Sequence, residues 1–536
     1  MPSRAANPAS RRLHTHATGL GLALAMSLLS ACTTLSGGAD VGKALPAPAR
    51  DCMVFLDELD RVVDIAGTRD GGEHRVAGFP YLRVDRFTAS FGATASAGEA
   101  RYRAWVERMR SIDDKARGYE IANLPDDVFP ILRTLSREEV GSQARTCGRL
   151  LIAEHAMQAA QRRRLPALAV VPDDYSTFKR ALGLYSLTGM TFAAAERNWQ
   201  RRTREDFASQ RRAPSPAGVA FQQYAPNDQP VSGEAAIAQA RAIVAGATVD
   251  ELGVPRLDED AQERLLAAFA PSFEIATGAE YDRFGPLQWI DLEGLVAPDA
   301  ERYWLDVDPS QPLVYARMAF TRYGEAVLPQ LVYTIWFNER PMQEAGDLLG
   351  GRLDGLVWRV TLNEKGEPLL FDSIQPSGRF AMFFPTARMR PKPPPENEPL
   401  IEWAYSPIAQ PIEQWVGPVP ALAGLSLRIS SQTHQLVGVG LPGVKWGEPV
   451  ARNAPYRMIS ADRLRVLPLP GRGSRSIFGP DGVVPHTERF ARYFFWPMGI
   501  ASPGSMRQWG RQPTAFIGRR HFDDADLLEK RFERVR

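Results

Sequence analysis

The spacing of apolar residues changes along this chain of 536 residues, and the change limits the fold more than any other feature. Within 51–212, apolar residues recur every three or four positions, for example in 53–65 and 100–112, which predicts helices. Farther on, every second residue of one run is apolar, which predicts a half-buried strand: Leu356, Trp358, Val360 and Leu362. Helices first and strands later predict an α+β fold, with a helical N-terminal domain followed by a β-rich, mainly antiparallel C-terminal domain.

Shorter segments extend this pattern. Ser136 and Glu139 have the spacing of a capping box and open a helical run to about residue 164. Two more helices are expected at 233–247 and 257–270. Further strands are expected at 314–320, 331–337, 369–374, 380–384, 400–405, 425–429, 435–439 and 489–496.

A change of composition marks the boundary between the two domains. Residues 200–230 are strongly charged at first and then rich in proline, serine and glutamine. Such a composition is typical of a linker. We therefore expect a helical domain at 51–225 and an α+β domain with a β-rich core at 226–536.

The start of the chain has the features of an export signal. Arginines at positions 4, 11 and 12 precede about fifteen apolar or small residues, which end in Leu29-Ser30-Ala31-Cys32. This segment resembles a bacterial lipoprotein signal. The resemblance implies that residues 1–31 are cleaved off, that Cys32 is lipidated, and that 32–50 tether the folded chain to a membrane. The alternative is a chance cysteine after an uncleaved anchor.

The residue after the cysteine bears on the destination. Lipoproteins of this class that stay at the inner membrane usually have aspartate there, whereas this chain has Thr33. The resemblance therefore implies the periplasmic side of the outer membrane.

Charge excludes one class of partner. Residues 1–31 hold three arginines and no acidic residue, so the rest of the chain has 61 basic and 62 acidic side chains. A nucleic-acid-binding protein usually carries a clear excess of positive charge. We therefore expect no nucleic-acid partner.

The chain has three cysteines. If Cys32 carries lipid, Cys52 and Cys147 remain as a pair in an oxidising compartment, where disulfides form and persist. The sequence thus predicts a Cys52–Cys147 disulfide. Two buried free thiols are the alternative.

Two similar segments carry paired carboxylates beside a tryptophan: Trp289, Asp291 and Glu293 in one, and Trp304, Asp306 and Asp308 in the other. If both segments are strands, each puts its tryptophan and its two acids on a single face. Two carboxylates can act as acid and nucleophile or base on a glycosidic bond, and flat aromatic rings bind sugars. These four acids are thus the candidate catalytic residues and the two tryptophans the candidate ligand contacts. Calcium ligation and solvated edge strands are the alternatives.

Two further features of the sequence have a structural and a functional interpretation. Residues 181–195 contain no charge but are too few to cross a membrane, which favours a buried helix over a surface that contacts lipid. His434, His486 and His521 lack the spacing of a known metal motif. We expect structural histidines, no metal and no cofactor, with a metal site across the strand region as the alternative.

These observations predict a membrane-anchored periplasmic lipoprotein with a binding or envelope-scaffolding role. The alternative is a hydrolase that uses the paired carboxylates on envelope glycan or another secreted substrate. The expected partners are the membrane, through the N-terminal lipid, and envelope glycan or envelope proteins.

Overall fold

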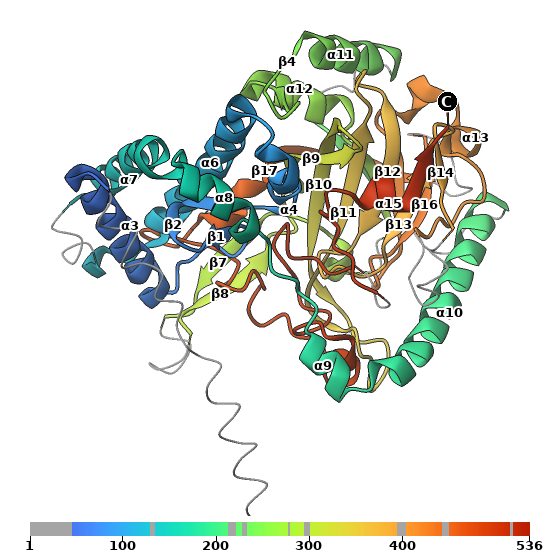
Figure 1. Cartoon of the computed structure of the whole chain (residues 1–536). Helices are drawn as coiled ribbons and strands as arrows, with labels where there is room; N and C mark the ends of the chain where they lie inside the picture. The colour runs from blue at the N-terminus through green and yellow to red at the C-terminus, as the bar shows by residue number, and fades with distance from the viewer. Residues whose placement is uncertain are drawn as a thin grey trace, which may run out of the picture.

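The computed structural model describes residues 45–128, 135–212, 221–227, 233–276, 279–293, 301–393, 404–441, 450–514 and 518–535. Helices gather in the N-terminal half, and one large mixed sheet forms most of the C-terminal half (Figure 1). The predicted α+β fold is confirmed. Cys32 lies outside the described residues.

A short hairpin and a set of helices form the N-terminal unit. The hairpin consists of β1 (His74–Val76) and β2 (Phe79–Val84). The elements around it are α3 (Ala47–Ile65), α4 (Arg86–Ala89), α5 (Gly92–Ala95), α6 (Glu99–Asn123), α7 (Arg137–Leu151), the π-helical turn η2 (Ile152–Ala156) and α8 (Ala159–Leu168). Their apolar faces share one core, centred on buried Trp105 and Leu56.

Helix α7 begins where the sequence predicts. The Glu139 amide donates to Ser136 Oγ at 3.3 Å, and the Ser136 amide donates to Glu139 Oε2 at 2.7 Å, which completes the capping box. The run does not continue unbroken to residue 164, because η2 separates α7 from α8.

A buried ion-pair cluster joins the hairpin to α6. Arg83 Nη2 donates to Glu120 Oε2 at 2.6 Å, and Arg83 Nε donates to Asp113 Oδ1 at 3.0 Å. Arg117 Nε also donates to Asp113, and Arg117 Nη1 donates to Asp60. Arg83 and Glu120 have no exposed surface, so each charge depends on its partners instead of water.

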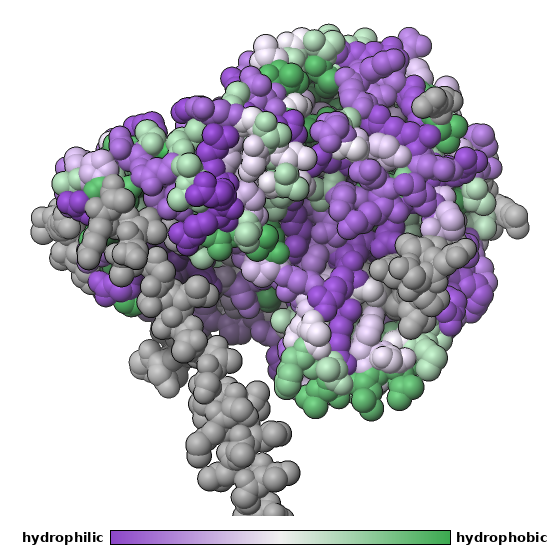
Figure 2. All heavy atoms as spheres, viewed as in Figure 1, coloured by the Kyte–Doolittle hydropathy of each residue, from purple (hydrophilic) through white to green (hydrophobic). Residues whose placement is uncertain are grey.

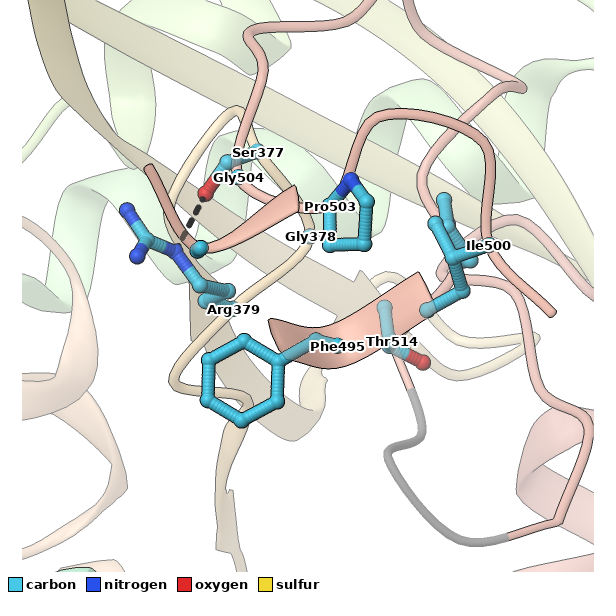
Figure 3. Close-up of a pocket in the computed structure, with 10 residues that line it drawn as sticks. Ser377, Gly378, Arg379, Phe495, Ile500, Pro503, Gly504 and Thr514 are labelled. Carbon is cyan, nitrogen blue, oxygen red and sulfur yellow. Dashed lines mark hydrogen bonds between the residues drawn. The ribbon is translucent and has the colours of Figure 1, made fainter. Parts of the chain in front are cut away.

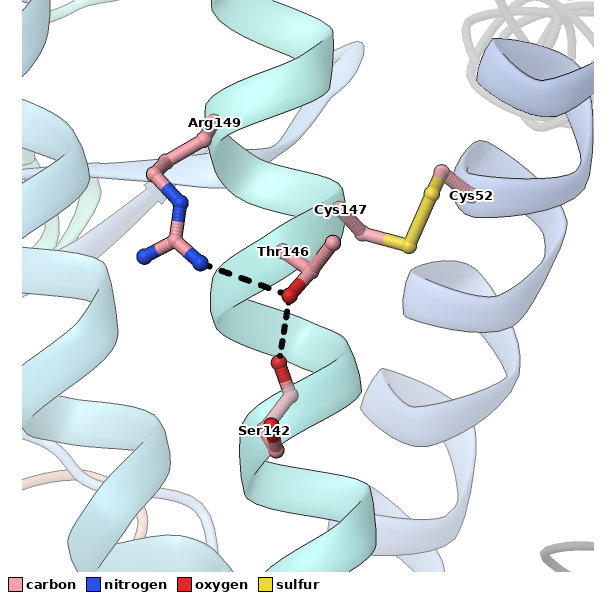
Figure 4. Close-up of a disulfide and its surroundings, with 5 residues drawn as sticks. All are labelled: Cys52, Ser142, Thr146, Cys147 and Arg149. Carbon is pink, nitrogen blue, oxygen red and sulfur yellow. Dashed lines mark hydrogen bonds between the residues drawn. A yellow bond between two sulfur atoms is a disulfide. The ribbon is translucent and has the colours of Figure 1, made fainter.

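The predicted disulfide is present. Cys52 of α3 and Cys147 of α7 are bonded, with their Cα atoms 5.1 Å apart (Figure 4). The bond fastens the first described helix to the core of the N-terminal unit, across a separation of 95 residues.

Replacing both cysteines with alanine is expected to lower the free energy of unfolding by about 2–4 kcal/mol, because the open chain gains conformational entropy when unfolded. Urea unfolding of the two proteins measures this difference. Thr146→Ala is the matched control, since Thr146 is an exposed neighbour on α7. A double variant as stable as the control would contradict the expectation.

Ten strands form the main sheet, in the order β13-β12-β11-β10-β9-β17-β3-β6-β15-β16. Their bounds are β3 Phe221–Pro226, β6 Ser272–Ala276, β9 Leu313–Tyr323, β10 Ala326–Arg340, β11 Gly351–Leu362, β12 Pro368–Ile374, β13 Met382–Pro385, β15 Ser426–Ile429, β16 Leu436–Gly440 and β17 Val450–Ser460. Neighbours are antiparallel except β17 with β3, β17 with β9, and β6 with β15. The sheet is therefore mainly antiparallel, as predicted.

Helices and loops cover both faces of this sheet. The helices are α9 (Thr177–Leu182), α10 (Tyr185–Arg212), α11 (Gly233–Gly246), α12 (Glu259–Ala268), α13 (Ile412–Val416), α14 (Arg492–Phe495) and α15 (Leu527–Arg531). Long α10 runs along the outer edge of the domain in Figure 1. Phe207 of α10 and Tyr224 of β3, which precede residue 225, pack in the core of the sheet.

Two strand predictions were wrong. Strand β11 is buried on both faces, because Arg359 pairs with Asp372 of β12 at 2.7 and 2.9 Å instead of facing water. The segment 489–496 contains α14 in place of a strand. A short apolar run fits the spacing of a helix as well as that of a strand, so the spacing alone could not distinguish a helix from a strand here. Residues 400–403 lie outside the described residues.

Candidate ligand-binding site

Each carboxylate segment contributes a strand, but Glu293 and Asp308 lie beyond the strand ends, and the strands separate the other two acids. Strands β7 (Leu287–Asp291) and β8 (Tyr303–Val307) pair antiparallel, with Ile290 opposite Trp304. Residues opposite each other share a face of the hairpin, and neighbours along a strand alternate. Asp291 and Asp306 therefore point to opposite faces.

The acids at the ends of the hairpin are held by local contacts. Asp291 accepts from Arg302 Nε at 3.0 Å and Nη2 at 2.7 Å, which lowers the pKa of Asp291. Glu293 also pairs with Arg302. Asp308 accepts from the Ser310 hydroxyl and amide, which lower its pKa. Neither described pocket is lined by any of the four predicted catalytic acids.

The two tryptophans of the hairpin differ in burial and in their contacts. Trp289 is buried, and its indole N–H donates to the Arg475 carbonyl at 3.2 Å. Trp304 is 36% exposed. The Arg352 guanidinium lies 3.6 Å from the centre of its ring, and the His486 ring stacks on it at 5.8 Å. The structure thus gives Trp289 a core position and leaves Trp304 at the surface.

The three histidines considered as metal ligands, His434, His486 and His521, lie in separate surroundings. His434 is buried on the Phe337 ring, His486 pairs with Glu301 at the surface, and His521 lies between Asp174 and Asp524. Within the described ranges, no group of three or more His, Cys, Asp or Glu side chains is arranged to hold a metal ion.

His434 gives the protein a pH-dependent contact. Its Nδ1 lies 3.1 Å from Asp354 Oδ2, and its Nε2 lies 3.6 Å from Asp282 Oδ1. Burial disfavours the charged ring, but the two carboxylates of Asp282 and Asp354 outweigh burial and raise the pKa of His434. The ring is therefore protonated more readily in the folded than in the unfolded chain.

We expect His434→Asn to destabilise the protein most below about pH 6.5, the pKa of an unfolded histidine. The difference from the unmodified protein should shrink as the pH rises through the raised pKa of the folded state. Urea unfolding at several pH values measures it, with the exposed His486→Asn as control. A difference that grows with rising pH would contradict the assignment.

A pocket lies between the turn that joins β12 to β13 and the segment 500–514. We call it the arginine pocket, and its space measures about 370 Å³, open solvent included. Figure 3 shows its lining: Ser377, Gly378, Arg379, Ala491, Phe495, Ile500, Pro503, Gly504, Pro513 and Thr514. In this view the Arg379 guanidinium lies on one side of the pocket and Ile500 on the opposite side.

Arg379 carries a buried charge that forms no ion pair in the described part of the chain, although the carboxylates of Asp354 and Asp347 act on it from farther away. Arg379 is only 7% exposed. Nε donates to Ser377 Oγ at 3.2 Å and Nη2 to Gln375 Oε1 at 3.5 Å, both neutral acceptors. Nη1 has no partner in the part of the chain that the structure describes. An unpaired buried charge is costly, so this position favours an anionic ligand.

A second arginine adds positive charge beside the first. Arg489 is 1% exposed, and its Nη2 donates to the Leu353 carbonyl. Its Nε and Nη1 have no partner among the described residues. Burial, and then the charge of Arg489, lowers the pKa of Arg379 to about 9, and burial lowers that of Arg489 to about 10. Both guanidiniums remain charged at neutral pH.

Gly504 allows this close arrangement. Its φ is +93°, and a Cβ there would lie 2.8 Å from Arg489 Cγ and 3.8 Å from Arg379 Nη1. Only glycine adopts this conformation readily and leaves that space open.

The other walls of the pocket are apolar. Phe495 and Ala491 come from the α14 region, and Ile500 and Pro503 from the segment after it. The arrangement therefore suits a ligand with an anionic group attached to an apolar body.

The described residues also line a second cavity. It measures about 510 Å³, open solvent included, and shares the same turn and segment through Pro376 and Arg507. The Trp336 indole N–H and Arg507 Nε face no partner among the described residues. Water or an extended ligand would satisfy these groups.

Comparison with known proteins found no match among family models, curated proteins or solved structures. In the described part of the chain, no helix is both long and apolar enough to cross a membrane.

Proposed function

We propose that this protein is a lipoprotein anchored through Cys32 to the outer membrane, on its periplasmic side, and that it binds an anionic amphiphile in the arginine pocket. The observation that carries the binding role is the buried Arg379 guanidinium, which forms no ion pair among the described residues and borders an apolar wall. The Cys52–Cys147 disulfide supports export to an oxidising compartment.

Binding fits the pocket better than catalysis. The described lining has arginine, serine and threonine as its polar side chains, without a carboxylate, histidine or cysteine to act as a base or strong nucleophile. Asp291 and Asp306, two of the acids on which a hydrolase would depend, point to opposite faces of the hairpin. Envelope components with phosphate or carboxylate groups and apolar chains are the class of ligand that the pocket suits.

Titration calorimetry with octyl phosphate tests the ligand class. Octanol and inorganic phosphate each supply half of its chemistry and serve as controls. Because a charged hydrogen bond contributes about 1.5–3 kcal/mol, octyl phosphate should bind at least about tenfold more tightly than octanol. If octanol bound as tightly as octyl phosphate, Arg379 would not contribute to binding. If inorganic phosphate bound as tightly as octyl phosphate, the apolar wall would not contribute.

Cell fractionation tests the anchor separately. The chain with Cys32 should sediment with membranes, and a Cys32→Ala variant should not be lipidated. Recovery of lipidated protein from the variant would contradict the assignment of Cys32.

A further inference from the structure

Eight exposed apolar side chains gather on one part of the surface. We call them the apolar face: Phe178, Leu182, Leu184, Leu187, Met190, Phe490, Tyr493 and Phe494. Each is between 52% and 76% exposed, and together they are half of the sixteen large exposed apolar residues in the described ranges. Figure 2 shows apolar side chains along the lower edge of the molecule, over α9 and the start of α10.

The residues of the apolar face come from two distant parts of the sequence that pack against each other. The 3-10 turn η6 (Trp496–Met498) packs against α9, and Arg180 Nε donates to the Met498 carbonyl at 2.7 Å. On α10, the Phe192 ring packs edge-on against Phe495 at 5.5 Å. These contacts hold the two groups of apolar residues side by side.

The uncharged run at 181–195 is therefore not a buried helix. Leu184, Leu187 and Met190 are all more than half exposed, whereas Gly189 and Ala193 on the other side are buried. Soluble monomeric proteins rarely expose a large apolar patch, and such patches mark a binding surface.

We propose that the apolar face rests on the lipid surface to which the chain is anchored. The inference depends on the lipid anchor of the proposed function. Twelve residues separate Cys32 from Leu45, the first described residue, and they span at most about 40 Å. A tether this short holds the face at a high effective concentration beside the bilayer.

Residues around the apolar face fit a membrane interface. Lys179 and Arg492 lie beside its apolar residues and can extend their charges to lipid head groups. Trp496, the first residue of η6, is half-buried, and tryptophan is enriched at membrane–water interfaces. Ala491 and Phe495, which line the arginine pocket, are sequence neighbours of Phe490 and Phe494 in this face, so the pocket lies close to the proposed lipid contact.

A spectroscopic experiment tests this contact without depending on lipidation. Residues 33–536, which include every described residue, are held by an N-terminal histidine tag on vesicles of phosphatidylethanolamine, phosphatidylglycerol and a nickel-chelating lipid. A polarity-sensitive fluorophore is attached through Leu187→Cys. Val54→Cys on α3, 57% exposed, is the matched control. The two native cysteines of this chain are bonded to each other, so the new thiol is labelled alone.

Spin-labelled lipids should quench the label at 187 about twofold, because interfacial side chains enter the bilayer by about 5–10 Å. The label at 54 should stay unquenched. Equal, weak quenching at both sites on vesicle-bound protein would overturn the proposal. Shielding of the label at 187 without vesicles, as protein concentration rises, would also overturn it and identify a second copy as the occupant. Octyl phosphate titration in solution reports on the pocket independently.

Discussion

Replacing Arg83 with methionine is expected to lower the free energy of unfolding of the N-terminal unit by about 3–5 kcal/mol. The change leaves Glu120 buried without its 2.6 Å partner, and it removes one of the two arginines that contact Asp113. Removing one partner of a buried ion pair costs this much because the remaining charge cannot return to water. Hydrogen exchange of the α6 amides measures the loss locally.

An exposed pair on the same helix is the control. Arg103 pairs with Glu99 at 3.3 Å, and both side chains are more than half exposed. Arg103→Met should change stability by less than about 0.5 kcal/mol. If both variants changed the α6 amides equally, the buried cluster would not have the role that we assign to it.

Replacing Arg379 with methionine is expected to have the opposite effect on stability. Because the Arg379 guanidinium is buried and forms no ion pair among the described residues, its removal should raise the free energy of unfolding by about 1–2 kcal/mol. Sites that are preorganised for a ligand often have this cost in the empty protein. Urea unfolding measures the gain.

Arg388→Met is the matched control, since Arg388 is partly exposed and pairs with Glu367 at 2.9 Å. This variant should lose stability slightly and keep its affinity for octyl phosphate. A loss of stability in Arg379→Met would mean that the guanidinium has a structural role.

Much of the fold could be predicted because local chemistry determines it. The capping box at Ser136 starts α7, and the turn from Asn363 to Gly366 joins β11 to β12, where Gly366 has φ +76°. The prediction of a half-buried strand at β11 was wrong because a tertiary contact determines the burial of this strand. The charge of Arg359 predicts a solvent-facing residue, but the ion pair with Asp372 on the neighbouring strand allows Arg359 to be buried.

The candidate site could not be predicted in the same way. Arg379, Arg489 and Gly504 come from distant segments and meet only in the folded chain. With 57 arginines in the sequence, no spacing marks the ones that are buried without a partner. The sequence allows strands at Trp289 and Trp304, but the relative orientation of their acids depends on pairing register, which the sequence leaves open.

The most direct test of the binding role is calorimetric titration of octyl phosphate into the unmodified protein and into Arg379→Met. We predict one saturable site in the unmodified protein and an affinity at least about tenfold lower in the variant. Equal affinity in the two proteins, or no binding to the unmodified protein, would contradict the account.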